Sequence, residues 1–349
     1  MKALLRIALV LLSISIAIPV ADRLTKAFDP YGISYLAEIN RYTQTAIRLS
    51  PDHAREGQQG RIFQNLPEVL HEHRRFTFQT DEYGFRRPRE WDYAPDETGR
   101  YRVLFLGDSV TLGWGVDDED TWVRRLEREA RGPEGEPLRC LNAGHLIYET
   151  VQEASLLEAW GPVHRPDLVV VTFVFNDVQP SWNTYLAFAH GQAGPALEPG
   201  TSLEAGETGR LTPIVERFAP NIGAVLRFRE HRDLYDRTDK SQLAPYKFYP
   251  EGLERVLGAL DRIRAKAAEL GAELALIDQA DQRPMPELVA WCEANGVPYI
   301  DARLSEEQAA QDVRNSAIDA HANALGNRFI AEYAAQGLID AGLLTPAPE

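Results

Sequence analysis

Apolar and polar positions follow two rhythms from Tyr101 onward. Short, almost continuous apolar runs are typical of buried strands, and they lie at Arg102–Leu106, Leu138–Asn142, Leu168–Phe175, Glu273–Ile277 and Val297–Ile300. Segments with apolar residues at helical spacing lie at Thr121–Ala130, Thr150–Trp160, Pro220–Tyr235, Glu251–Leu270, Pro284–Ala294 and Ala322–Ala334. This alternation predicts an α/β fold, a five-stranded, doubly wound parallel sheet with helices on both faces.

The preceding residues follow other patterns. Ile33–Ile47 carries apolar residues at helical intervals, which predicts an amphipathic helix packed against the rest of the chain. Arg74–Arg87 predicts a short hairpin or edge strand with a turn near Asp81 and Gly84.

The N-terminal segment Ala3–Val20 is apolar except for Arg6 and two serines. It predicts either a cleaved signal peptide or a retained membrane helix. We favour the membrane anchor because the run approaches spanning length and no clean small-residue cleavage site follows it. Either interpretation exports the body of the chain, in a bacterium to the periplasmic face of the inner membrane or, after cleavage, to the periplasm or the exterior.

The chain divides into an anchor or signal peptide at 1–22, an N-terminal extension at 23–100 and an α/β domain at 101–349. The interval 178–250 interrupts the strand–helix rhythm, and its first half is rich in Gly, Pro, Thr and Glu. An insertion directly after a strand end is more often a lid or binding loop than a second domain.

The amino-acid composition argues against several classes of function. The 349 residues carry a formal net charge of -15, which argues against a nucleic-acid partner. Cys140 and Cys292 are the only cysteines, which excludes a disulfide scaffold and a cysteine-rich metal site. No spacing of His with Cys or carboxylates is typical of zinc, and we interpret Asp117–Asp120 as a solvated helix start rather than a metal site. We therefore expect no metal and no cofactor.

Candidate chemistry gathers where predicted strands end. Ser109, Gly144 and Asn176 each follow a strand, at the edge where open α/β sheets bind their ligands. A serine hydroxyl needs a base, and His321 can accept its proton while Asp319 orients the imidazole. The backbone N–H groups of Ser109 and Gly144 and the Asn176 amide can stabilise an oxyanion.

Four blocks of residues resemble a known family. They are GDSV at Gly107–Val110, NAG at Asn142–Gly144, ND at Asn176–Asp177 and DAHAN at Asp319–Asn323. In this order they resemble the SGNH (GDSL-type) hydrolases over roughly Arg102–Leu344. The resemblance implies a flavodoxin-like three-layer α/β/α fold and metal-free esterase, lipase or acyl-transfer chemistry.

The resemblance also assigns roles to residues. It implies that Ser109 is the nucleophile, His321 the base and Asp319 its partner. The implied oxyanion hole comprises Ser109, Gly144 and Asn176. Two positions depart from the usual blocks, because Val174 replaces a glycine and Ile318 stands where the aspartate is commonest.

The implied strand order is 2-1-3-4-5. In that order, the second strand, with Cys140, and the helix before the fifth strand, with Cys292, lie towards opposite edges of the sheet. We therefore expect no disulfide between these cysteines.

Other polar residues have structural interpretations. We expect Asp108 and Asp177 to brace the active-site loops by accepting backbone N–H groups. His145 is interpreted either as a residue lining the site or as an exposed loop residue. Thr150 and Glu153 have the spacing of a capping box at the start of a helix.

The leading hypothesis is an exported serine esterase that cleaves an acyl ester, such as an acetyl ester on an envelope glycan. One alternative is an O-acyltransferase that moves the acyl group to an envelope polysaccharide and receives it from a membrane partner. An alternative of another class is a non-catalytic envelope glycan-binding protein, although the Ser, Gly, Asn and His set argues against it.

Overall fold

The computed structural model describes residues 2–49, 63–87, 99–178, 212–237, 249–279, 285–317 and 319–348. At its centre is an eight-stranded sheet with the order β11-β10-β9-β6-β8-β5-β4-β3. Five strands are parallel: β6 (Tyr101–Leu106), β8 (Leu138–Asn142), β9 (Leu168–Phe173), β10 (Glu273–Asp278) and β11 (Tyr299–Asp301). Numbered along the chain, they lie in the order 2-1-3-4-5, so the predicted parallel sheet and its strand order are confirmed.

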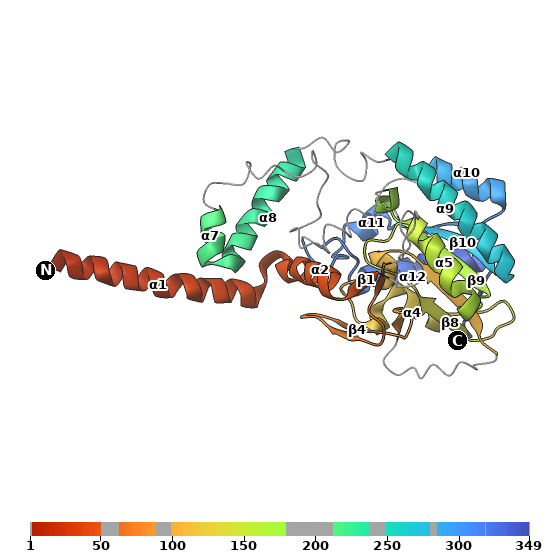
Figure 1. The fold of residues 1–349 in the computed structure, drawn as a ribbon, viewed down its shortest axis with the longest axis horizontal. Coiled ribbons are helices and arrows are strands. Elements are labelled where there is room, and N and C mark those ends of the chain that lie inside the picture. Colours follow the sequence, from red (N-terminus) through yellow and green to blue (C-terminus); the bar gives the residue numbers. More distant parts are fainter. Residues whose placement is uncertain are drawn as a thin grey trace.

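Helices cover both faces of the parallel strands (Figure 1). Alternate residues of β6 point to opposite faces, as strand geometry requires. Leu104 and Leu106 join the core under α5 (Thr150–His164), α9 (Tyr249–Leu270) and α10 (Pro286–Asn295). Val103 and Phe105 join the core under α4 (Trp122–Glu129) and α12 (Ala324–Asp340). The result is the predicted three-layer α/β/α arrangement.

Three antiparallel strands extend this sheet beyond the prediction. They are β3 (Leu70–Glu72), β4 (Thr77–Thr80) and β5 (Arg86–Arg87). The predicted hairpin within Arg74–Arg87 is confirmed, and its turn is held by the Asp81 side chain. Arg86 of β5 pairs with Asn142 of β8, and this contact joins the N-terminal extension to the main sheet.

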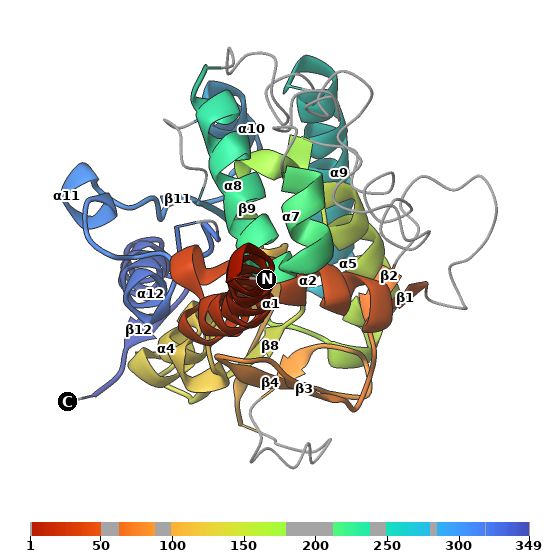
Figure 2. The same cartoon turned by 90° about the vertical axis from the view of Figure 1, so that its left-hand side faces the viewer.

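The N-terminal helices lie against the inserted helices. Helix α1 (Lys2–Phe28) projects from the body and is followed by η1 (Pro30–Gly32) and α2 (Ile33–Thr45) (Figure 1). Viewed along α1, the helices α7 (Thr212–Phe218) and α8 (Pro220–Arg237) lie beside it (Figure 2). The Asp22 carboxylate accepts the backbone N–H groups of Asn221 and Ile222 at 2.9 and 3.1 Å, so α1 supplies the cap of α8.

Many large apolar side chains of α1 are exposed, namely Leu9, Val10, Leu12, Ile14, Ile16, Ile18, Val20, Leu24 and Phe28. Among the described residues, none of the helices combines the length with the apolar character that a membrane crossing requires.

The remaining elements are short. They are β1 (Ile47–Leu49), β2 (Phe63–Asn65), α3 (Ser109–Leu112), η3 (Asp118–Asp120), β7 (Ala130–Arg131), η4 (Phe175–Val178), α11 (Glu306–Ala309) and β12 (Thr345–Pro346). Much of the predicted insertion 178–250 lies outside the described residues. The predicted capping box at the start of α5 is wrong by one position, because Glu149 and Gln152 form it. Glu153 instead turns into the interior.

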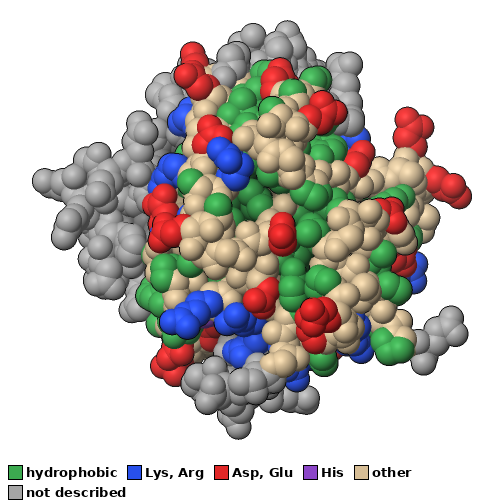
Figure 3. All heavy atoms as spheres, turned by 90° about the vertical axis from the view of Figure 1, so that its right-hand side faces the viewer, with side chains coloured by type: hydrophobic (Ala, Val, Ile, Leu, Met, Phe, Trp, Pro, Cys, Tyr) green, Lys and Arg blue, Asp and Glu red, His purple; other side chains and the backbone are tan. Residues whose placement is uncertain are grey.

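Charges of both signs are interspersed on the face turned away from α1 (Figure 3). Arg262 of α9 pairs with Glu158 of α5 at 2.8 Å, and both side chains are partly exposed. Such surface pairs contribute about 0–1 kcal/mol each, so the layers are held together mainly by apolar packing.

Cys140 and Cys292 are buried and free, as expected.

Candidate active site

Ser109 lies immediately after β6 at the carboxyl edge of the parallel sheet. The turn before it is tight: a Cβ on Gly107 would approach Thr111 Oγ1 to 2.1 Å, so only glycine fits there. The Asp108 side chain caps α3 by accepting the Val110 N–H at 2.8 Å. This cap fixes the first residue of the short helix, which is Ser109 itself.

The loop before α12 brings His321 to the serine. His321 Nε2 lies 2.7 Å from Ser109 Oγ, and His321 Nδ1 is hydrogen-bonded to Asp319 Oδ1. The loop is folded back on itself by an antiparallel bridge between Arg314 and Ala322. Residues more than two hundred positions apart therefore form one continuous hydrogen-bonded chain.

Asp319 is held by a residue that sequence reasoning missed. Asn315 Nδ2 donates to Asp319 Oδ2 at 3.1 Å and to the Trp114 carbonyl at 2.9 Å. Beneath it, Gly115 has a φ of +95°, and a Cβ there would collide with the Asn315 amide. No motif marks Asn315, because its partner in the loop after Ser109 is 201 positions away.

The environment favours the protonated form of His321. Burial lowers the pKa of His321, but the hydrogen bond and negative charge of Asp319, with a further contribution from Asp108, outweigh it. The net effect is a pKa raised above the ordinary histidine value. Asp319 thus stabilises the imidazolium that forms when His321 takes a proton from Ser109.

Asn176 lies beside the nucleophile. Asp108 Oδ2 accepts a hydrogen bond from Asn176 Nδ2 at 3.2 Å and lies 3.3 Å from Ser109 Oγ, whose single hydroxyl hydrogen can point either to Asp108 or to His321. The shared acceptor brings the amide next to the serine, where a second amide hydrogen can meet an oxyanion.

Gly144 packs directly on α3. A Cβ on Gly144 would lie 2.2 Å from the Leu112 backbone nitrogen, so glycine permits this approach. Its N–H donates to Asn142 Oδ1 at 3.0 Å in this structure. The Gly144 N–H is thus near the nucleophile helix but already has an acceptor, and its role as an oxyanion donor stays a prediction.

The N-terminal extension braces the loop after Ser109. The fully buried Arg86 guanidinium donates to the carbonyls of Leu112, Gly113 and Val116 at 2.8–2.9 Å and pairs with Asp118 at 3.4 Å. Asp118 was interpreted as part of a solvated run, and this is wrong for that residue. The sequence could not give this contact, because nothing in it places β5 beside α3.

Neither interpretation of His145 describes it correctly. It is 1% exposed, its Nδ1 is bonded to the Ala143 carbonyl at 2.8 Å, and its ring stacks on Tyr148. Burial lowers the pKa of His145 to about 4, so it is a neutral packing residue. Asp108 and Asp177 do accept backbone N–H groups, from Val110 and Val174 respectively, as expected.

No group of three or more His, Cys, Asp or Glu side chains among the described residues could hold a metal.

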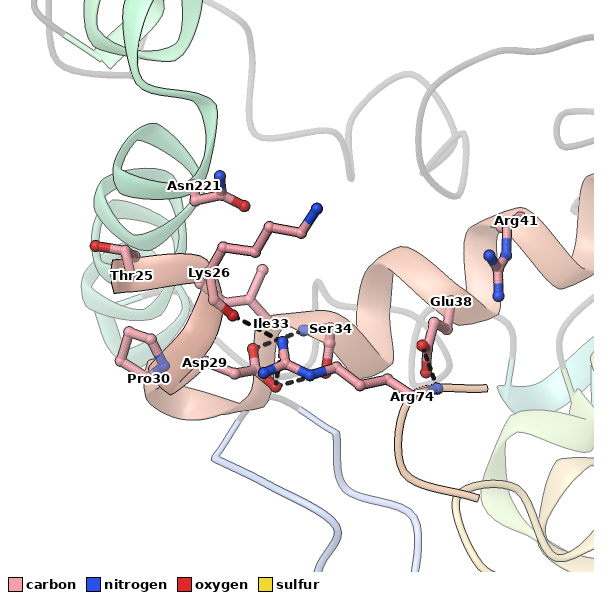
Figure 4. A pocket seen from close by; sticks show the side chains of 10 residues that line it. All are labelled: Thr25, Lys26, Asp29, Pro30, Ile33, Ser34, Glu38, Arg41, Arg74 and Asn221. Atoms are coloured by element: carbon pink, nitrogen blue, oxygen red, sulfur yellow. Dashed lines mark hydrogen bonds and ion pairs between the residues drawn. The ribbon is translucent and has the colours of Figure 1, made fainter. Parts of the chain in front are cut away.

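A pocket of about 340 Å³ lies at the joint of α1, α2 and α8 (Figure 4). At this joint, Arg74 donates to the Lys26 and Ala27 carbonyls at 2.8 Å, while Asp29 accepts from Ser34 and Arg75. The triad does not line this pocket.

The chain matches no protein-family model and no curated protein. Solved structures to which it is similar include GDSL-type lipolytic proteins and an acylhydrolase. An esterase from Pseudoalteromonas covers 69% of this chain and 97% of its own, at 12% identity and a TM-score of 0.40. A GDSL-like lipase from Bacteroides thetaiotaomicron covers 69% and 89%, at 14% identity and a TM-score of 0.35. An acetyl-xylooligosaccharide esterase from Geobacillus covers 70% and 96%, at 13% identity and a TM-score of 0.36. Likeness this loose supports no functional conclusion.

Proposed function

We propose that this protein is a serine esterase of the SGNH type that cleaves an acyl ester through an acyl-enzyme on Ser109. The observation that carries the proposal is the 2.7 Å contact between His321 Nε2 and Ser109 Oγ, with Asp319 bonded to the opposite ring nitrogen. This geometry is what general-base activation of a serine requires.

The reaction has two halves. Ser109 Oγ attacks the ester carbonyl carbon while His321 takes the hydroxyl proton, and the C–O bond to the alcohol breaks as His321 returns that proton to the leaving oxygen. Water then attacks the acyl-enzyme with His321 again as the base, which releases the carboxylic acid and restores Ser109. Asn176 is the side-chain donor for the oxyanion in both halves.

We propose an acetyl ester on a cell-envelope glycan as the substrate class. Discharge onto a sugar hydroxyl instead of water would make the protein an O-acyltransferase. Acyl release measured with and without acetylated and unacetylated glycans separates the two. Fast hydrolysis with no transfer to any acceptor supports the esterase, whereas release that depends on the acceptor supports the transferase.

The decisive variant is Ser109→Ala. Removing the nucleophile of a serine hydrolase lowers kcat by about 10⁶-fold, so we expect hydrolysis of p-nitrophenyl acetate to fall to background. Ser305→Ala, which changes the surface serine that caps α11, is the matched control and keeps the parent rate. Equal rates in Ser109→Ala and the parent would remove Ser109 from the mechanism.

We also propose that the apolar N-terminal segment exports the catalytic body. The exposed apolar side chains of α1 support an environment other than water for this helix. Fusion of a periplasm-dependent reporter to the C-terminus, with and without residues 1–22, tests this: a reporter active only with the segment supports export, and equal activity contradicts it.

A further inference from the structure

Three carboxyl groups are buried beside the nucleophile turn, and none of them belongs to the triad. Asp108 is 2% exposed, while Glu153 of α5 and Asp177 of η4 are fully buried. They belong to three different segments, which are linked by the hydrogen bonds of Asn176 with Asp108 and of Thr150 with Asp177. The mechanism above uses only Asp108, as the acceptor shared by Ser109 and Asn176.

Their hydrogen bonding is unequal. Asp108 accepts hydrogen bonds from Val110 N and Asn176 Nδ2 and is the alternative acceptor of the Ser109 hydroxyl. Asp177 Oδ2 accepts two contacts at 3.3 Å, from Thr150 Oγ1 and Val174 N, whereas its Oδ1 has no partner among the described residues.

Glu153 is the extreme case. Neither of its two carboxyl oxygens has a hydrogen-bond partner in the described part of the chain. An ionised carboxylate buried in this way would be strongly destabilised, because it has lost its water and gained no donor.

Among the described residues, no positively charged side chain offsets the negative charge that Glu153 and Asp177 would carry if they were ionised. The Arg255 guanidinium of α9 is engaged by Glu149, at 3.7 Å, and by the Val178 carbonyl, to which it donates. Burial raises the pKa of Asp108, and the Val110 N–H, the positive charge of protonated His321 and the Asn176 amide partly offset this effect. The neutral Tyr148 neighbours Glu153.

We propose that Glu153 and Asp177 are positioning residues that stay protonated in the working enzyme. A single negative charge, on Asp108, then holds Ser109 and Asn176, and loss of the two protons to the solvent sets an alkaline limit to activity.

Electrostatics agree with this assignment. Burial raises the pKa of Glu153 well above the ordinary carboxyl value, and the negative charges of Asp108 and Glu149 raise it further. Burial likewise raises the pKa of Asp177, with Glu153 and Asp108 adding to the effect and the Val174 N–H only partly offsetting it. Carboxylates that share one site cannot all ionise.

Ionisation would disturb catalysis through a short path. Asp177 is covalently next to Asn176, and η4 is anchored by the contact of Asp177 with Thr150. Ionised Asp177 is repelled by the negative charges of Glu153 and Asp108, and its displacement moves the Asn176 amide that faces the oxyanion. The pair thus acts on the reaction through Asn176 and touches no substrate.

The pH dependence of the free energy of unfolding tests whether Glu153 and Asp177 are protonated, without any assumption about function. A proton that only the folded state holds makes the unfolding equilibrium constant rise about tenfold per pH unit. Denaturant unfolding of the full chain is measured between about pH 6 and pH 9 for the parent, Glu153→Gln and the control Glu158→Gln, which changes an exposed carboxyl of the same helix that pairs with Arg262. We expect Glu153→Gln to lower the slope against pH by about one proton and Glu158→Gln to keep the parent slope.

Equal slopes in the parent and Glu153→Gln would overturn the proposal. If Glu153→Gln does not fold, infrared spectra of the parent decide instead. A protonated-carboxyl C=O band at neutral pH that disappears at alkaline pH supports the proposal, and its absence at neutral pH contradicts it.

The activity arm rests on the proposed ester hydrolysis. We expect the alkaline limb of kcat/KM to move upward by about one pH unit or more in Glu153→Gln and to stay in place in Glu158→Gln. Superimposable limbs in the parent and Glu153→Gln would contradict the role in positioning. A parent with no esterase activity would instead remove the proposed function, while the unfolding slopes would still test the protonated pair.

Discussion

Two acidic neighbourhoods flank the candidate nucleophile, and they differ in the hydrogen bonds that their buried carboxyl groups accept. On one, Asp319 is bonded to the His321 ring and to its N–H, and Asn315 donates to its second oxygen. On the other, Glu153 is fully buried, and neither of its oxygens meets a donor among the described residues. Environment, rather than residue type, therefore decides which carboxyl group can carry charge during a reaction.

The largest effect on activity is expected in the charged neighbourhood, at Asp319. Asp319→Asn removes the charge that raises the His321 pKa and is expected to lower kcat about 10⁴-fold, as in a well-studied serine protease. The sign for pH follows: a lower pKa leaves His321 neutral at lower pH, so the acid limb of the rate profile moves to lower pH.

The measurement is kcat/KM against pH for Asp319→Asn and the parent. Asp312→Asn, on the exposed part of the same loop, serves as the control and keeps the parent profile. An acid limb that stays in place in Asp319→Asn would mean that Asp319 does not set the basicity of His321.

An intermediate effect is expected where the two neighbourhoods meet, at Asn176. Asn176→Ala removes the amide that shares Asp108 with Ser109 and should lower kcat about 10²–10³-fold, the usual cost of one oxyanion donor. KM should change little, because the contact strengthens only as the oxyanion forms. Steady-state kinetics decide, and a change confined to KM would assign Asn176 to substrate binding instead.

The smallest effect is expected at Asn315, one step behind the triad. Asn315→Ala deletes the donor to Asp319 Oδ2 and the tie to the Trp114 carbonyl. A hydrogen bond to a charged group contributes about 1.5–3 kcal/mol, so we expect about a tenfold loss of kcat and a lower unfolding midpoint. Full activity together with parent stability would show that Asp319 needs no support from this side chain.

Much of the fold was predictable because short stretches of sequence are enough to indicate each strand and helix. Each parallel strand is a short apolar run, and Leu138–Asn142 matches β8 at both ends. The strand order rested on the resemblance of four short blocks, and the same blocks pointed to Ser109, Asn176, Asp319 and His321. The geometry brings these four residues together at one edge of the sheet.

The contacts that the sequence did not reveal depend on how distant segments pack and on the residue at which a helix begins. Arg86 reads as one of several arginines in a hairpin, yet it is buried under the loop after Ser109 and bonds three of its carbonyls. Glu153 reads as a helix-capping residue, yet the cap begins one residue earlier and turns it into the interior. A one-residue shift of a helix start changes which side chain faces the core.

The most direct test of the account is covalent labelling of the folded full chain with a fluorophosphonate, followed by mass spectrometry of the peptides. We predict a single adduct on Ser109, much slower labelling in Asp319→Asn, and no adduct in Ser109→Ala. Labelling that persists in Ser109→Ala, or a folded parent that the probe does not modify, would contradict the claim that His321 activates this serine.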